Sequence, residues 1–137
     1  MGYFSYICNM EIWKDIIGYE GYYQISNTGR VKALARKINI HNNNIRIARE
    51  RILKPIGRGA KGQYIGYNLS KNRKNIKFSA HRLVAQHFIT NPNNHPVVSH
   101  IDNNPTNNHV SNLQWVTQST NILHCVASKR HRHQITW

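Results

Sequence analysis

The sequence is poor in cysteine, and this scarcity excludes a class of metal site. Among 137 residues the only cysteines are Cys8 and Cys125, which stand near opposite ends of the chain. They form no Cys-x-x-Cys pair, so a cysteine-based zinc knuckle or ribbon is excluded. Two isolated cysteines are typical of a reducing compartment, where they remain thiols, and a bridge would require the two ends to meet. Hydrophobic residues make up 39% of the chain, enough for one modest core without disulfides.

Long apolar runs are also missing. No stretch approaches the roughly 20 consecutive apolar residues that span a bilayer. The first residues, Met1 to Cys8, lack both a charged region and a small-residue cleavage site, so we predict no signal peptide. We therefore expect a soluble intracellular protein with no membrane partner, and the sequence indicates no obligate protein partner.

Acidic residues are the third scarcity. Five Asp and Glu face nineteen Lys and Arg, which gives a net charge of +14. Fifteen of the nineteen cations lie between Arg30 and Arg82, where Glu50 is the only acid, whereas residues 83–128 contain no Lys or Arg. Such a balance favours nucleic acid, an anionic membrane surface or an acidic partner. The basic half, residues 30–82, can bind a polyanion. The cations that we expect to contact it, DNA if the motif described below holds, are in particular Arg30, Lys32, Arg58, Lys61, Arg73, Lys74, Lys77 and Arg82.

Alternating apolar residues predict a chain of short strands with few helices. Residues 22–34 read as a β-hairpin around Ser26-Asn27-Thr28-Gly29, whereas the polar residues 36–50 predict a loop or flexible excursion. Turns are expected at 57–62 and 71–75. Further strands are expected at 52–55, 64–69, 76–78, 97–98 and 113–116.

Two helices are predicted in the second half of the chain. Ser79 could cap a helix over residues 81–88, and Thr117 or Ser119 a final helix that runs to about residue 128. The lysines and arginines from Lys129 onward form a basic tail.

The segment from Val97 to His124 contains the motif that carries the chemistry. His100 ends the first strand, Asn112 opens the return strand and Asn121 lies on the helix that follows. This spacing, with the preceding His-Arg-Leu-Val-Ala-Gln-His-Phe, resembles the HNH nuclease motif of intron and phage homing endonucleases. The resemblance implies a ββα-metal unit that hydrolyses DNA phosphodiester bonds, and an origin in a phage, virus or mobile element is compatible with it.

The residue types suit that reaction. A histidine with an ordinary pKa of about 6.5 can deprotonate water near neutral pH. A hard divalent cation such as Mg²⁺, or Mn²⁺ in its place, accepts oxygen ligands and keeps several waters. By the resemblance, His100 is the general base, Asn112 braces the loop and orients His100, and Asn121 is a metal ligand. His124, on the same helical face, could supplement or replace Asn121. Asp102 would cap the loop and is the next candidate ligand.

Each of these residues also has a structural interpretation. Taken alone, His100 is an ordinary loop histidine, Asn112 a turn residue and Asn121 a helix-surface residue. The ten Asn and His between residues 91 and 109 could simply satisfy the backbone of a loop. The joint spacing favours the nuclease site. We expect His81, His87 and His109 to be structural or close to DNA.

One position departs from the family pattern. Immediately before the general base the family usually carries Asp, Asn or His as a metal ligand, and here that residue is Ser99. Because a neutral hydroxyl is a weaker ligand, metal affinity could be low, the metal could bind mainly through DNA, or the enzyme could have lost activity.

The N-terminal part resembles a second family module. Residues 11–34 are similar to the small nuclease-associated DNA-binding motif that precedes the nuclease unit in many homing endonucleases. The positions that carry this likeness are Trp13, Ile16, Gly18, Tyr19, Gly21, Tyr22, Ser26, Asn27, Gly29, Arg30 and Val31.

We therefore predict an α+β protein in which a β-rich basic region precedes the nuclease unit. Its parts are a nuclease-associated β module (11–55), a basic β region (56–78), the ββα-metal unit (79–128) and a basic tail (129–137).

Two other functions compete with a metal-dependent endonuclease. Ser99 and the short segment after the final helix favour a DNA-binding protein of the same fold with weakened or lost catalysis. An RNA-binding or ribosome-associated protein would explain the charge but not the spacing of His100, Asn112 and Asn121.

Overall fold

A computed structural model describes residues 10–123 and shows a strand-rich α+β fold, as predicted. The cysteines, His124 and the predicted basic tail lie outside the described residues. The strands are β1 (Trp13–Asp15), β2 (Tyr23–Ser26), β3 (Val31–Ala33), β4 (Arg36–Ile40), β5 (Asn44–Ala48), β6 (Arg51–Ile52), β7 (Ile56–Arg58), β8 (Tyr64–Lys71), β9 (Lys74–Ser79), β10 (Val97–His100) and β11 (Leu113–Val116). The helices are α2 (Ala80–Phe88) and a 3₁₀ turn, η1 (Val110–Asn112), and residues 118–123 are also helical.

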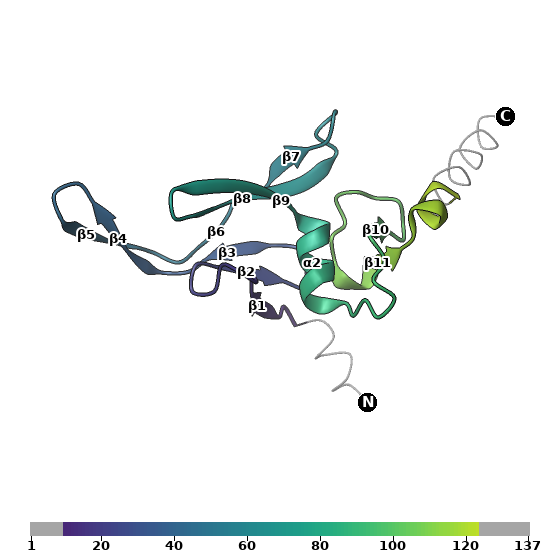
Figure 1. Ribbon diagram of the computed structural model, residues 1–137, viewed down its shortest axis with the longest axis horizontal. Coiled ribbons are helices and arrows are strands. Elements are labelled where there is room, and N and C mark those ends of the chain that lie inside the picture. The colour runs from purple at the N-terminus through teal and green to yellow at the C-terminus, as the bar shows by residue number, and fades with distance from the viewer. Residues whose placement is uncertain (1–9, 124–137) are drawn as a thin grey trace.

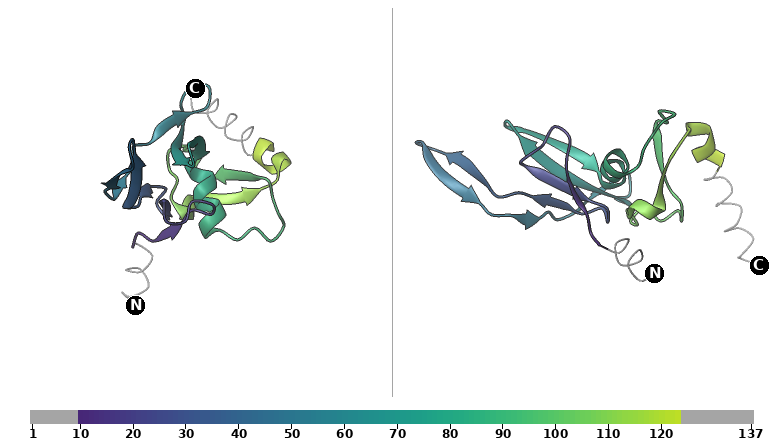
Figure 2. Two further views of the ribbon diagram at one scale, coloured as in Figure 1. Left: turned by 60° about the vertical axis from the view of Figure 1, so that its left-hand side comes forward. Right: turned by 90° about the horizontal axis from the view of Figure 1, so that it is seen from below.

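The strands form small antiparallel sheets arranged along an elongated body. One sheet has the order β1-β2-β3-β6 and another β7-β8-β9, and two further pairs are β4–β5 and β10–β11. Helix α2 lies between these parts and contacts β2, β8, β9, β10 and β11. The β4–β5 hairpin projects at one end of the molecule, and β10–β11 lies at the other (Figures 1 and 2).

The core is one hydrophobic cluster. The N-terminal module, the basic β region and the predicted nuclease unit all contribute residues to it. Ile25 and Val31 come from the first sheet, Leu69 from β8, and Leu83 and Val84 from α2, and all five are at most 1% exposed. The two α2 residues, with Ala80, repeat at helical spacing and form its buried face. The N-terminal module and the nuclease unit are therefore packed around one hydrophobic core.

Helix α2 confirms the predicted helix, with one difference at its start. Ser79 precedes it in an extended conformation, but its side chain makes no capping hydrogen bond. The helix ends because Ile89 returns to an extended conformation. Within residues 10–123, no helix is long and apolar enough to cross a membrane.

The prediction of a loop or flexible excursion over residues 36–50 is wrong. Residues 36–48 form the β4–β5 hairpin, with five cross-strand pairs from Arg36↔Ala48 to Ile40↔Asn44. Asn42 and Asn43 close it with φ of 63° and 55°, a conformation that Asn tolerates better than most residues. Because the hairpin projects from the body, neither face is buried, and the isoleucines mix with polar residues on both faces. Within each strand isoleucine alternates with polar residues, at 38 and 40 and at 45 and 47, but the polar composition and the central Asn42-Asn43-Asn44 led to the prediction of a loop.

The turn expected at residues 57–62 is shorter than predicted. Gly57 and Arg58 belong to β7, which pairs with β8, and only the residues after them form the turn. Gly57 escapes strand prediction because glycine has low strand propensity. Its place in the ladder reflects close backbone packing, since an added Cβ would lie 3.2 Å from the Gly62 Cα.

The shared core makes a prediction about cooperativity. We expect Ile25→Ala, which removes a side chain with 0% exposure, to lower the free energy of unfolding by about 2–5 kcal/mol. Because β2 shares its core with the nuclease unit, hydrogen exchange should accelerate in residues 97–116 as well as in 23–33. Ile47→Ala, at a position that is 68% exposed on the hairpin, is the control and should change stability by less than about 0.5 kcal/mol. Retained protection of residues 97–116 in Ile25→Ala would contradict a shared core.

Candidate active site

The scaffold of the site is the β10–β11 pair and the helical segment that follows it. The two strands pair from Val97↔Val116 to His100↔Leu113, which places His100 at the end of β10. The helical segment 118–123 begins after Thr117, whose Oγ1 accepts the Thr120 N–H at 3.2 Å. Of the two predicted caps, the structure thus uses Thr117. The described residues therefore follow one another as strand, strand and helix, as expected for a ββα unit (Figure 1).

His100 is held in a defined orientation by one amide. Its side chain is buried, and its Nε2 lies 2.8 Å from the Oδ1 of Asn108, which is buried as well. A carbonyl oxygen can only accept a hydrogen bond, so Nε2 carries the proton and donates it. In the neutral ring the Nδ1 atom then keeps its lone pair, and it makes no hydrogen bond to another of the residues 10–123. An imidazole in this form presents Nδ1 as its basic atom.

Asn112 ties the loop between β10 and β11 together. Its Nδ2 donates to the Asp102 carboxylate and to the Asn107 carbonyl, both at 2.8 Å, and its Oδ1 accepts the Asp102 N–H at 3.1 Å. The Asp102 carboxylate also accepts hydrogen bonds from the Asn107 side chain and the Asn104 backbone. These bonds, with Asn107 first, hold the pKa of Asp102 below its ordinary value. Asp102 is the only acid between residues 83 and 128, and its carboxylate thus closes this loop.

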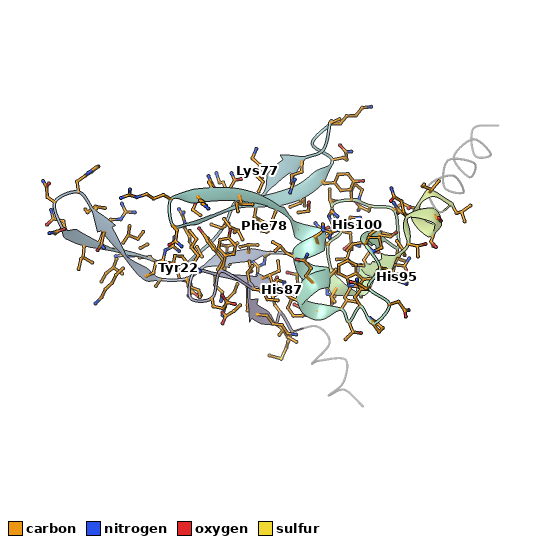
Figure 3. The ribbon with its side chains drawn as sticks, viewed as in Figure 1. Tyr22, Lys77, Phe78, His87, His95 and His100 are labelled. Carbon is orange, nitrogen blue, oxygen red and sulfur yellow. The ribbon has the colours of Figure 1, made fainter. Side chains whose placement is uncertain are left out.

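His100, labelled in Figure 3, lies close to two other rings, one from α2 and one from β8. The His81 ring centroid lies 5.1 Å from that of His100, and Tyr64 lies 5.7 Å from His81 and 6.3 Å from His100. The Nδ1 of His81 is buried without a hydrogen-bond partner. Burial above all, then the charges of His100, Arg82 and Arg58, lower the pKa of His81 to about 4. His81 is therefore neutral at pH 7 and adds no charge beside His100.

Two of the predicted metal ligands, Ser99 and Asn121, are neutral oxygen donors. Ser99 is buried in β10, and strand alternation places its side chain on the face opposite to His100. Asn121 lies half-buried on the helical segment, and His124 lies outside the described residues. Within residues 10–123 no three His, Cys, Asp or Glu side chains gather into a metal-binding group. A hydroxyl and an amide fit a hard cation that keeps water and phosphate oxygens as its other ligands, and do not fit zinc.

Two of the predicted DNA-contacting residues are already paired with acids. Arg30 makes a two-point hydrogen-bonded ion pair with Glu11, which lowers the pKa of that carboxyl to about 2. Lys32 lies 3.4 Å from the Glu50 carboxylate and 4.4 Å from the centre of the Trp13 ring. A phosphate that binds here would compete with these carboxylates.

The other predicted cations line the second sheet and α2. Lys61 lies in the exposed turn after β7, Arg73 and Lys74 at the turn from β8 to β9, and Lys77 on β9 (Figure 3). Arg58 and Arg82 donate hydrogen bonds to the carbonyls of Lys77 and Pro96, which fixes their direction without neutralising their charge. We call these six residues the basic surface. Arg58, which pairs with Tyr64, and Arg82, which follows His81, lie near the His100 site, whereas Arg73 and Lys74 lie at the opposite end of β8.

Sequence reasoning missed two residues of the site. Asn108 stands in a loop so rich in asparagine that no pattern distinguishes it from Asn103, Asn104 or Asn107. Tyr64 belongs to a predicted strand, where a tyrosine indicates packing. Only the fold shows that Tyr64 lies near His100, because it brings the start of β8 close to the end of β10.

Comparison with known proteins identifies both parts of the chain. The NUMOD4 motif matches residues 11–57, and the HNH endonuclease family matches residues 78–123. The DNA endonuclease I-HmuI of Bacillus phage SP01 is 38% identical over 110 residues, which are 80% of this chain and 55% of that protein. An HNH endonuclease of Acanthamoeba polyphaga mimivirus, L245, is 46% identical over 66 residues, 48% of this chain and 20% of that protein.

Comparison with solved structures leads to the same relative. A solved structure that describes DNA binding and cleavage by the HNH homing endonuclease I-HmuI matches with a TM-score of 0.61 and 32% sequence identity. The match covers 90% of this chain and 65% of that one. The chain thus spans about half to two thirds of the phage protein and a fifth of the mimivirus protein. The predicted resemblance and the α+β fold are confirmed.

The buried His81 ring makes a prediction about acid stability. Its pKa is lower in the folded protein than in the unfolded chain, so the unfolded chain binds more protons between about pH 4 and pH 6.5. The free energy of unfolding should therefore fall as the pH drops through that window. His81→Phe keeps a ring against Tyr64 and His100. Between about pH 7.5 and pH 5, we expect its free energy of unfolding to fall by about 1–2 kcal/mol less than that of the parent chain.

Denaturant unfolding at the two pH values checks this expectation. The control is His41→Gln, at an exposed position of the β4–β5 turn, which should keep the acid sensitivity of the parent. Equal acid sensitivity of His81→Phe and the parent chain would contradict the assignment.

Proposed function

Because the chain belongs to the HNH endonucleases, with a NUMOD4 motif before the HNH domain, we propose that it hydrolyses DNA phosphodiester bonds with His100 as the general base. The observation that carries the proposal is the state of the His100 ring. A buried imidazole whose Nε2 proton is held by Asn108 presents a basic Nδ1 at the end of β10. A general base needs both this tautomer and a fixed direction.

The proposed reaction combines these residues with the family resemblance. Nδ1 of His100 accepts a proton from water, the resulting hydroxide attacks phosphorus, and the bond to the 3′-oxygen breaks. The departing 3′-oxygen takes up a proton from solvent, and His100 releases its own to solvent. By the family resemblance, the products carry a 5′-phosphate and a 3′-hydroxyl. Two features of the surroundings support this step: His81 is uncharged at pH 7 and adds no second cation beside the ring, and hydrogen bonds hold the Asp102 carboxylate within its loop.

A divalent cation such as Mg²⁺ would bind to the Asn121 amide and the Ser99 hydroxyl, and it would stabilise charge on the scissile phosphate and the departing oxygen. This donor set contains no carboxylate, so the protein alone would hold the ion weakly and DNA phosphates would complete its coordination.

The basic surface supports DNA as the substrate. Arg58 on β7 and Arg82 on α2 lie close enough to His81, beside His100, to lower its pKa, and Glu50 is the only acid among the cations of residues 30–82. The phage relative is named a DNA endonuclease, and its solved structure is described as one of DNA binding and cleavage. A DNA strand across this surface would bring a phosphate to Nδ1 of His100. The second candidate, a DNA-binding protein without catalysis, is favoured by one observation, the hydroxyl of Ser99 where the family carries a stronger ligand.

The His100 assignment is tested by its removal. His100→Ala should lower the rate of supercoiled-plasmid relaxation in Mg²⁺ by about 10²–10⁴-fold, because the base that activates water is lost. DNA affinity in a gel-shift assay should remain within about twofold, since the predicted phosphate-contacting cations are unchanged. The control is His95→Ala, since it is the backbone of His95, not its ring, that bonds to the Asn91 side chain. If His100→Ala relaxes plasmid as fast as the parent chain, His100 is not the base.

The role of Ser99 separates the two candidate functions. If weak metal affinity limits the rate, Ser99→Asp and Ser99→Asn should raise cleavage at low Mg²⁺ by about tenfold or more and lower the Mg²⁺ concentration required. Because Ser99 is buried, thermal unfolding of both variants must first show that they fold. Ser99→Ala is the matched control and should not gain activity. Folded variants without any change in Mg²⁺ dependence would exclude Ser99 as the limiting ligand position.

A further inference from the structure

The turn between β2 and β3, in the NUMOD4 region, contacts the loop that orients His100. The carbonyl oxygen of Asn27 accepts the Val110 N–H at 2.8 Å, a backbone bond across more than 80 residues of sequence. Two residues on, Gly29 lies directly against Asn108. A Cβ at Gly29 would lie 2.7 Å from the Asn108 Cβ and 3.2 Å from its carbonyl oxygen, closer than packed atoms come.

This turn is itself fixed from two other directions. The Asn27 side chain is buried, accepts the Ile12 N–H at 2.9 Å and donates to the Met10 carbonyl at 3.1 Å. The buried Tyr67 of β8 donates its hydroxyl to the Gly29 carbonyl at 3.0 Å. The turn is therefore a rigid support, and Asn108 is seated against it.

From these contacts we infer that the Asn27–Gly29 turn is a positioning element of the nuclease site, which seats Asn108 so that its amide oxygen fixes the Nε2–H tautomer of His100. The inference rests on the proposed function for its catalytic consequence, but the tautomer itself can be measured without cleavage. Gly29 is required here for two reasons. Its φ of +94° is strained for other residues, and any side chain would push Asn108 away.

The same reasoning assigns the N-terminal module a role in the chemical step. A change more than 70 residues from His100 in sequence should alter the imidazole in the way that a change of Asn108 does. Asn108, Gly29 and Asn27 are positioning residues, because they act through His100 and not on the substrate.

The first test measures the tautomer in the full chain without DNA. Long-range ¹H–¹⁵N spectra distinguish Nε2–H from Nδ1–H imidazole, and the His100 signals are identified by their loss in His100→Gln. We expect Nε2–H in the parent chain and in Asn108→Asp, which keeps the acceptor oxygen. We expect a mixture of tautomers in Asn108→Leu and in Gly29→Ala.

The second test measures cleavage of a DNA substrate. Asn108→Leu and Gly29→Ala should lower kcat about 10- to 100-fold with KM nearly unchanged, whereas Asn108→Asp should stay within a few-fold of the parent chain. The matched control is Gly18→Ala. Gly18 has a similar φ of +86°, but a Cβ there meets nothing within 4 Å, so this variant carries the backbone strain without the contact.

The outcomes separate the inference from the proposed function. An Nδ1–H imidazole in the parent chain, or a Gly29→Ala variant that matches Gly18→Ala in tautomer and in rate, would overturn the inference. If Gly29→Ala does not fold, Asn108→Leu against Asn108→Asp decides whether the amide sets the tautomer, and equal spectra for the two would overturn it. A parent chain that cuts no DNA but loses the Nε2–H form in both Asn108→Leu and Gly29→Ala would remove the nuclease function and leave the positioning contact in place.

Discussion

The fold depends on the packing of one short helix against three other parts of the molecule. Helix α2 has nine residues, yet its buried face of Ala80, Leu83 and Val84 packs in one cluster with the first sheet, β8 and the β10–β11 pair. Packing of this kind does not deform continuously, so the position of each partner on α2 also sets its position relative to the others. The distance between the basic surface and the His100 site is fixed in this way, because β8 and β9 carry the cations and β10 carries the histidine.

The site is built from amides in a chain of high positive charge. Asn112 and Asn108 supply the hydrogen bonds that brace the loop and orient His100, and the carboxylate of Asp102 accepts three hydrogen bonds within that loop. The amides hold this geometry without adding further negative charge, which would repel a phosphate. Burial lowers the pKa of His81 to about 4, so its ring is neutral at pH 7 and adds no charge beside His100.

The sequence was most informative where a pattern reflects burial or a reaction. Two patterns mark a buried face: the alternation around Ile25 and Val31, and the helical spacing of Leu83 and Val84. A third, the spacing of His100, Asn112 and Asn121, matches a known motif. The predicted hairpin, helix and strand pair are present. The β4–β5 hairpin was missed because it buries neither face. Asn108 was missed because its proposed role depends on a contact with Gly29, which is far away in sequence. From sequence alone, an asparagine that accepts a histidine N–H cannot be distinguished from one that closes a turn.

The contact between Gly29 and Asn108 also explains why the two sequence motifs should occur together in one chain. If the N-terminal module only added phosphate contacts, a flexible connection to the nuclease unit would suffice. Instead, two of its cations, Arg30 and Lys32, are paired with Glu11 and Glu50. Its turn contributes no charge to the loop beside His100, the proposed general base, and contacts that loop through its backbone atoms. Backbone contacts of this kind transmit position rather than charge. If His100 is the base and a single amide orients it, the site gains from such a support, because a displacement of about 1 Å at the reacting centre can cost about 10²-fold in rate.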